Sequence, residues 1–320
     1  MTLQRTELDG VPVFWLTAPL PLSATLLFRV GGRDETFRTV GISHLVEHLA
    51  MSTLGRRRHE YNATVDLTFT AFTATGREAA VVSYLADVCT ALAALPMDRL
   101  RTEAKVLTAE AGQVVHPAVG ELLRQRFGPQ GVGLAGVQSP ALEQLQADEV
   151  VAFAARHLTR GNAALALTGP PPDSLRLALP SGSRIEPPVD TPLDLPLPMW
   201  CPLGGPAVAV SLLVPTGDSA QYEAAAATLR IALDRAMDEL RHRHGWCYDV
   251  DLSLEPTGAH SVACLYSDPP DEHAEDVRRG RSRSCRTCAT TGRPSRSSTR
   301  TWRTSESTSP TREPARAWPR

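Results

Sequence analysis

Residues 41–52, with the sequence GISHLVEHLAMS, decide how the rest of the chain is interpreted. As a helix, this stretch places His44 and His48 four residues apart on one face, with Glu47 beside them. The remaining positions are almost all apolar, which predicts a buried helix with three polar groups that need partners. A bound zinc ion would compensate their burial, because neutral imidazole is a good zinc ligand and the metal charge keeps a nearby carboxylate ionised.

The order His-x-x-Glu-His reverses the commoner His-Glu-x-x-His and is the inverted zincin signature. Two alternatives compete with a metal site. The match could arise by chance among the nine histidines of the chain, or the two imidazoles could be satisfied by ordinary hydrogen bonds. Residues further along the chain decide between these possibilities.

A second helix is predicted from about residue 98 to residue 111, in the sequence DRLRTEAKVLTAEAG. It carries Glu103 and Glu110 seven residues apart, so both carboxylates lie on one stripe two turns apart. A solvated helix face is the ordinary explanation of such a pair. A zinc ion with two histidine ligands needs a third protein ligand, however, and Glu110 is the natural candidate.

The hydrophobic pattern predicts strands at residues 11–16 and 24–30, one strand at residues 65–75 and a helix at residues 78–95. After a proline-dense stretch, the sequence VAVSLLVPTGDSAQYEAAAATLRIALDRAMDELR repeats the earlier order of strand, turn and helix without the histidine motif. We therefore predict four segments. They are an N-terminal zinc-binding domain (1–169), a proline-rich linker (170–206), a partial second repeat (207–277) and an Arg/Ser/Thr-rich tail (278–320).

Charge and composition narrow the function classes. The tail carries a net charge of +10 and residues 1–277 carry −12, so nucleic acid is an improbable partner of the folded part. The start of the chain shows no secretory signal and no apolar run reaches membrane-spanning length, so we expect a cytoplasmic protein with no membrane partner. Four cysteines are scattered singly among apolar neighbours, as in reduced cores, and the Cys285/Cys288 pair is a weak metal or redox signal.

The tail has two interpretations. It contains no Leu, Ile, Val, Phe or Met, so we expect it to be disordered. One interpretation is a basic arm that binds nucleic acid or anionic surfaces. The interpretation that we favour is that the second repeat stops halfway, as a change of reading frame would cause.

The sequence resembles the pitrilysin/insulinase family of zinc peptidases, which includes the mitochondrial processing peptidases. The resemblance rests on the sequences VGGRDE, GISHLVEHL, YNATVDLTFTAF and LRTEAKVLTAE, in the order of the family. It continues through the residues from GLAGVQSP to ALALTG, which are similar to the end of the family's first repeat. The resemblance implies an α+β fold of two related repeats of the processing-peptidase type, with the second repeat incomplete.

The resemblance also implies roles for particular residues. His44, His48 and Glu110 would bind zinc, Glu47 would be the general base on a zinc-bound water, and Glu103 would support the site. Asn62 would lie beside the substrate backbone. Arg241 and Tyr248 of the second repeat would hold the substrate near the metal.

The implied function is that of a zinc metalloendopeptidase acting on extended or unfolded polypeptides, with a homodimer or a heterodimer of related subunits as a possible assembly. A first alternative is a non-catalytic or catalytically impaired subunit of a paired peptidase, because the second repeat is incomplete. A second alternative is a protein that binds through its arginine-rich tail.

Overall fold

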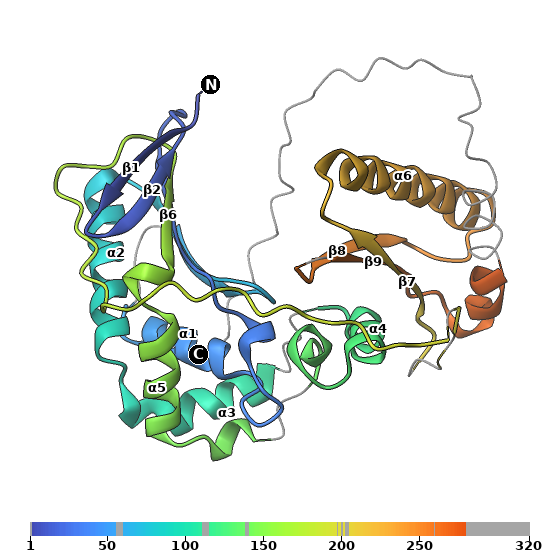
Figure 1. The fold of residues 1–320 in the computed structure, drawn as a ribbon, viewed down its shortest axis with the longest axis horizontal. Helices are drawn as coiled ribbons and strands as arrows, with labels where there is room; N and C mark the ends of the chain where they lie inside the picture. Colours follow the sequence, from blue (N-terminus) through green and yellow to red (C-terminus); the bar gives the residue numbers. More distant parts are fainter. Residues whose placement is uncertain are drawn as a thin grey trace, which may run out of the picture.

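The computed structural model describes residues 2–55, 60–110, 115–137, 141–196, 198–199, 201, 205–258 and 260–279. The chain is an α+β protein with two β-sheets, as the sequence predicts (Figure 1). The elements around the first sheet are β1 (Gln4–Leu8), β2 (Val11–Trp15), β3 (Leu22–Phe28), α1 (Ile42–Ser52), β4 (Glu60–Val65), β5 (Thr70–Gly76), α2 (Glu78–Ala93), α3 (Leu100–Glu110), α4 (Pro117–Phe127), α5 (Ala147–His157) and β6 (Ala163–Leu167). Those of the second sheet are β7 (Val208–Pro215), α6 (Ser219–Met237), β8 (Asp251–Pro256) and β9 (His260–Ser267).

The first sheet has six strands in the order β1-β2-β6-β3-β5-β4, and all neighbouring pairs are antiparallel except β2 with β6. Alternate side chains of β3 are buried, because one face of the sheet packs against helices. Helices α1, α2, α3 and α5 share the main hydrophobic core with this face and lie to the left of and below the sheet in Figure 1. The sheet and α3 therefore fix the position of α1.

The chain that leaves β6 runs back across this unit as an extended strap, residues 173–193 (Figure 1, yellow-green). It belongs to the segment predicted as a proline-rich linker. Leu175, Leu177 and Leu179 are at most 3% exposed and join the main core, and Asp9 accepts a hydrogen bond from the Leu177 N–H at 2.8 Å. This part of the segment is thus packed against the first unit.

The single strand predicted for residues 65–75 is wrong, because the chain turns at Asp66 and forms the hairpin of β4 and β5. The Asp66 N–H donates to the Phe69 carbonyl at 2.8 Å and closes the turn. Leu67, inside the turn, is 1% exposed and packs in a separate hydrophobic cluster with α4. The predicted strand thus contained the buried turn and most of β5, together with Val65, the last residue of β4. The sequence pattern also missed β1.

The second sheet repeats part of the first, as the sequence predicts. In the first unit β3 leads through α1 to the hairpin β4–β5, with the sheet order β3-β5-β4. In the second unit β7 leads through α6 to β8 and β9, with the order β7-β9-β8. The described part of the second sheet has three strands, half the number of the first. Residues 280–320, with Cys285 and Cys288, lie outside the described residues, so the predicted disorder of the tail stays a prediction.

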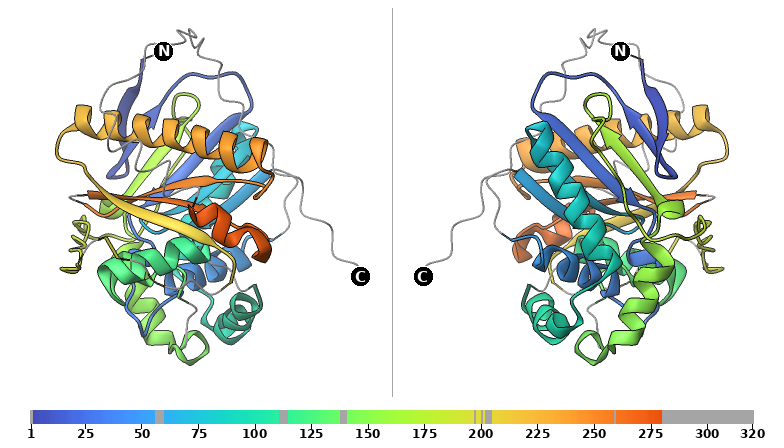
Figure 2. Two further views of the ribbon diagram at one scale, coloured as in Figure 1. Left: turned by 90° about the vertical axis from the view of Figure 1, so that its right-hand side faces the viewer. Right: turned by 90° about the vertical axis from the view of Figure 1, so that its left-hand side faces the viewer.

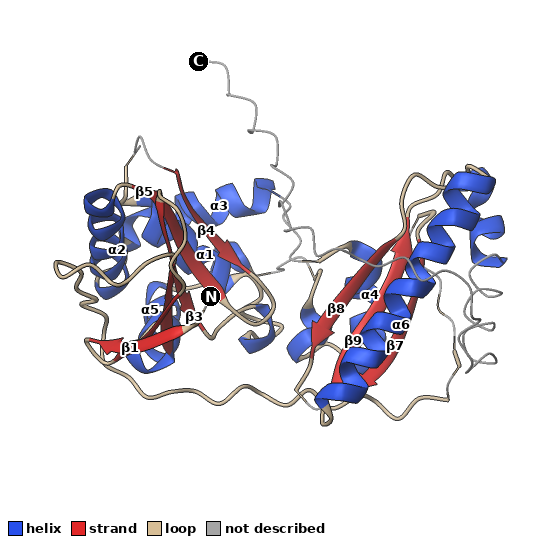
Figure 3. Cartoon of the chain, turned by 90° about the horizontal axis from the view of Figure 1, so that it is seen from above, coloured by secondary structure: helices blue, strands red, loops and turns tan. Residues whose placement is uncertain are grey.

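Helices from both repeats cover the second sheet. α6 lies over one face, and α4 of the first repeat packs against the other (Figures 1 and 3). Figure 2 shows α6 at the end of the molecule that carries the second sheet and α2 at the opposite end. Arg126 of α4 donates hydrogen bonds to Oγ and the carbonyl oxygen of Ser211, and His116 bonds to Asp268 at 2.8 Å. The two repeats are therefore joined through α4.

No single helix among the described residues is long and apolar enough to cross a membrane. α2 and the residues Met97–Glu110 are long and apolar enough only when taken together, and they are bent by 77° relative to each other. Tyr84, Leu85 and Val88 of α2 are fully or almost fully buried inside the first unit. This burial is that of a core helix.

Candidate metal centre

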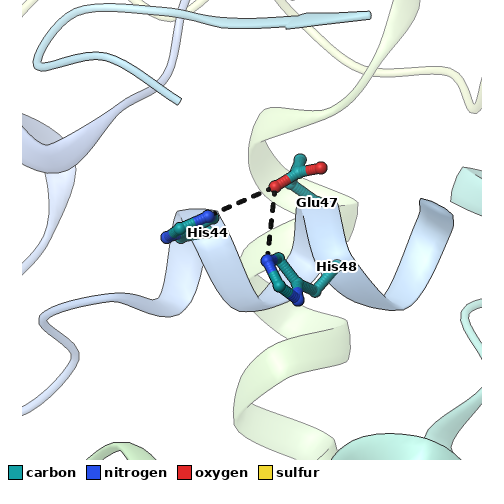
Figure 4. A group of neighbouring side chains, drawn as sticks. All are labelled: His44, Glu47 and His48. Carbon is teal, nitrogen blue, oxygen red and sulfur yellow. Dashed lines mark ion pairs between the residues drawn. The ribbon is translucent and has the colours of Figure 1, made fainter. Parts of the chain in front are cut away.

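Helix α1 presents its polar side chains on one side. Its apolar residues Ile42, Leu45, Val46 and Leu49 are buried in the main core, as predicted. His44, Glu47 and His48 occupy the remaining side, and in Figure 4 the Glu47 carboxylate lies above the His48 ring and is joined by dashed lines to both imidazoles. Glu47 is 7% exposed, whereas the two histidine side chains are partly open to solvent. The two histidine side chains are therefore accessible to solvent on the side of α1 that faces away from the core.

The distances within this group are short. Glu47 Oε2 lies 3.5 Å from His44 Nε2 and 4.0 Å from His48 Nε2, and the two ring centroids are 4.8 Å apart. One nitrogen or oxygen of each residue lies within 4.8 Å of the others, a spacing that fits a shared metal ion. The two histidines and Glu47 therefore meet at one point, as the motif predicts.

Helix α3 brings both predicted carboxylates to the same histidine. Glu103 Oε2 lies 3.5 Å from His48 Nδ1, and Glu110 Oε2 lies 3.5 Å from His48 Nε2. Glu103 is buried, whereas Glu110, at the end of α3, is about half exposed. A carboxylate at Nδ1 favours the tautomer that carries the proton there and leaves Nε2 free as a ligand.

The spacing agrees with a tetrahedral metal site. Two ligand atoms about 2.1 Å from a tetrahedral zinc lie roughly 3.4 Å apart. The 3.5 Å between His48 Nε2 and Glu110 Oε2 matches this value. Glu110 is not in the group of atoms that all lie within 4.8 Å, so its partly exposed side chain must turn towards His44 to complete the site. The donor set of neutral imidazoles and carboxylates suits zinc.

The electrostatics also favour a cation. Burial and the neighbouring His48 lower the pKa of His44 to about 4, so its imidazole is neutral at pH 7 and able to bind a metal. Burial, with the charges of Glu110 and Glu103, raises the pKa of Glu47 to about 7. Three acidic side chains lie around the two histidines, and a divalent cation would stabilise such a group.

The predicted substrate residue Asn62 lies on β4, which is the edge strand of the first sheet and contacts α1. Its side chain is exposed, and its carbonyl oxygen accepts a hydrogen bond from the hydroxyl of Tyr84 at 3.0 Å. The described residues pair β4 with β5 alone. Among the described residues, the outer side of β4 is therefore open beside α1.

Arg241 and Tyr248 lie on the second unit and contact each other. The Arg241 guanidinium stacks over the Tyr248 ring, 4.6 Å from its centroid, and Tyr248 is 79% exposed. Within the described part of the chain, neither residue makes a hydrogen bond, ion pair or ring contact with α1. Their predicted contact with a substrate near the metal stays a prediction.

Two further residues next to the site were not predicted from the sequence. Arg99 donates two hydrogen bonds to Glu103 Oε1, at 2.6 and 3.0 Å, which leaves Oε2 for His48. Glu35 accepts hydrogen bonds from the first turn of α1. The four-residue spacing of Arg99 and Glu103 could have predicted their ion pair on one helix face. No sequence pattern predicts the contact of Glu35 with α1.

By sequence, no protein-family model and no curated protein matches the chain. Solved structures do match. The inactive domain of a peptidase M16 from Pseudomonas fluorescens aligns with 92% of this chain and 81% of its own, at 15% identity and a TM-score of 0.68. A chain of complex III from Candida albicans aligns with 88% of this chain and 76% of its own, at 15% identity and a TM-score of 0.65. Pitrilysin aligns with 92% of this chain at 12% identity and a TM-score of 0.64, and the chain spans 37% of pitrilysin.

These likenesses establish the fold, because all three structures match most of this chain despite their low identity. They include an inactive domain and a subunit of a larger complex, so the fold alone does not define an activity. The chain therefore has the fold of the pitrilysin-type peptidases, and residues 44–48 carry the inverted His-x-x-Glu-His motif in it.

Proposed function

We propose that this protein is a zinc-dependent endopeptidase that cleaves extended or unfolded polypeptide segments. The observation that carries the proposal is the meeting of His44, Glu47 and His48 with the two α3 carboxylates, at distances that fit a metal site. The pitrilysin-type fold supports it, since that fold includes metallopeptidases.

In this proposal His44, His48 and Glu110 hold the ion. When bound, zinc supplies Lewis-acid chemistry by polarising the scissile carbonyl and acidifying a water molecule. Glu103 fixes the tautomer and the orientation of His48 through Nδ1, and Arg99 holds Glu103.

Glu47 moves the proton. Its carboxylate accepts a proton from the attacking water while the water oxygen bonds to the carbonyl carbon of the substrate. The same carboxyl group then donates this proton to the amide nitrogen, the C–N bond breaks and the amine leaves. A pKa raised to about 7 suits a group that both accepts and returns a proton, and a cation beside it favours the carboxylate at neutral pH.

The edge strand β4 supports the choice of substrate. An extended peptide can add to an open sheet edge through backbone hydrogen bonds, and β4 passes next to α1 with Asn62 exposed. A folded protein offers few free strands for this pairing. We therefore propose polypeptide segments in extended form as the substrates.

A second candidate is a catalytically impaired subunit of a paired peptidase. The described second sheet has three strands where the first has six, and among the described residues Arg241 and Tyr248 make no hydrogen bond, ion pair or ring contact with α1. In this case a second copy or a related subunit completes the site. Peptide cleavage would then require the added partner even though the protein binds zinc.

Zinc stoichiometry and cleavage of an unstructured, internally quenched peptide test both candidates. The zinc-loaded protein should cleave the peptide, and Glu47→Gln should keep one zinc per chain but lose at least 100-fold in rate. Glu78→Gln, an exposed change on α2, is the matched control. Equal cleavage by the wild type and Glu47→Gln would remove Glu47 from the mechanism, and a protein without stoichiometric zinc would refute the proposal.

A further inference from the structure

The helix that carries the metal site begins without a capping side chain of its own. Its N-cap residue is Gly41, with a φ of 89°, and no side-chain cap hydrogen bond comes from that residue. The first N–H groups of a helix have no intrahelical acceptors and need outside partners. His44 lies in this first turn, so the quality of the cap bears directly on its position.

Glu35 supplies the missing acceptors from the preceding loop. Its Oε2 accepts the Gly41 N–H at 2.7 Å, and its Oε1 accepts the Ser43 N–H at 2.9 Å. Glu35 is 9% exposed. One carboxyl group therefore holds two successive parts of the first turn through its two oxygens.

The loop that carries Glu35 is itself fixed. The Gly32 and Arg33 N–H groups donate to the carbonyls of Asp66 and Leu67 at 3.0 and 2.9 Å. A side chain at Gly31 would overlap the Asp66 carbonyl oxygen, so the loop sits directly against the β4–β5 turn. Asp34 forms an ion pair with Arg29 of 2.8 Å. Glu35 therefore approaches α1 from a preorganised support.

The two histidines differ in their support. His48 lies one turn deeper in α1 and is flanked by Glu103 and Glu110. Among the described residues, the His44 ring lies within ion-pair distance of Glu47 and in ring contact with His48, both on the same helix. The direction of His44 thus depends on its own helical turn, and that turn depends on Glu35.

We propose that Glu35 is a positioning residue for the metal site, which fixes the first turn of α1 so that His44 points at the ion. The inference rests on the proposed zinc site and extends it by one residue that touches neither metal nor substrate. Loss of the Glu35 cap should therefore weaken zinc binding more than the loss of a helix cap elsewhere in the protein does.

The test compares Glu35→Gln with Asp218→Asn. Asp218 also caps a helix, since its Oδ1 accepts the Ala220 and Gln221 N–H groups of α6 at 2.9 and 3.1 Å, but α6 carries no metal ligand. Zinc affinity is measured by competition with a chromophoric chelator, and the melting temperature of the metal-free protein is measured alongside. Glu35→Gln should weaken zinc binding 10- to 100-fold, as is typical of residues that orient metal ligands. Asp218→Asn should change it less than about twofold.

Zinc affinity of Glu35→Gln equal to that of the wild type would overturn the inference while leaving the zinc site intact. An equal loss of affinity in both variants would also overturn it, because the effect would then follow stability. If Glu35→Gln does not fold, Glu35→Asp decides: its shorter carboxylate cannot reach both N–H groups, so affinity should fall, and an unchanged affinity refutes the inference. A wild type that binds no zinc refutes the proposed function itself.

Discussion

A buried ion pair fastens the strap to the first unit, and its removal should be costly. Arg33 Nη2 lies 2.6 Å from Asp190 Oδ2, and both side chains are at most 6% exposed. Asp190 Oδ1 also accepts the Val132 N–H at 3.2 Å, and Arg33 donates to the carbonyl oxygen of Pro188. Asp190→Ala would leave the Arg33 charge buried without its carboxylate partner. We expect the free energy of unfolding to fall by about 3–5 kcal/mol.

The pKa of Asp190 supports this choice of single variant. Burial raises this pKa despite the nearby Arg33, so removing the carboxylate from water costs more than the pairing returns. Breaking the pair is therefore destabilising, whereas replacing both partners with apolar residues should be nearly neutral. The combined variant Arg33→Met with Asp190→Leu is expected to recover most of the stability lost in Asp190→Ala.

Urea unfolding followed by circular dichroism measures both effects. The matched control is Glu239→Gln, which removes a surface pair of 3.0 Å with Arg243 and should cost no more than about 0.5 kcal/mol. Gly131→Ala should also lower the free energy of unfolding without removing either charge. Its β-carbon would overlap Asp190 Oδ1, and Gly131 has a φ of 51°. If Asp190→Ala costs no more than the control, the strap is not held by this pair and the reasoning fails.

Three further predictions concern the metal site. The pKa of Glu47 in the folded protein, about 7, lies above its unfolded value, so the contribution of Glu47 to stability falls as the pH rises from about 4.5 to about 7. In urea unfolding without metal, the free energy of unfolding of Glu47→Gln should match that of the wild type near pH 4 and exceed it by about 3 kcal/mol at pH 8. A difference independent of pH would contradict this prediction. Arg99→Ala should weaken zinc binding about tenfold in chelator competition, because Glu103 loses its hydrogen bonds. Arg101 bonds to the Glu143 carbonyl instead, so Arg101→Ala should leave zinc binding unchanged. Chelating zinc present at 1,000 times its Kd should lower the unfolding free energy by about 4 kcal/mol, and an unchanged melting curve would exclude a stabilising ion.

The sequence predicted the features that depend on short-range periodicity. The apolar residues around His44 and His48 required a buried helix, and the seven-residue spacing of Glu103 and Glu110 required one helical stripe; the structure has both. The hairpin turn at Asp66 was missed because its Leu67 is buried against α4, which makes a turn look like part of a strand. Buried turns carry the composition of the core that covers them.

The support of the site could not be predicted, because no helical or strand period relates the residues that it joins. Glu35 caps α1 across a loop, and Asp190 reaches Arg33 from 157 residues away. Glu35 ends the stretch VGGRDE, but nothing in that stretch connects it to the start of α1, and Asp190 belongs to no motif. Each would pass for a solvated side chain in the sequence alone. Only the fold shows that both are buried and paired.

The joint between the repeats has a consequence for the proposed substrate residues of the second unit. Val119, Leu123 and Phe127 of α4 share one hydrophobic cluster with Leu213 and Val262 of the second sheet. A sheet of three strands needs apolar cover to be stable, and here a helix of the first repeat provides it on one face while α6 covers the other. The distance of the second unit from α1 is therefore set by α4 rather than by the proline-rich segment. A substrate held by both units must accommodate the spacing that α4 imposes, which favours an extended chain that reaches from β4 towards the second sheet.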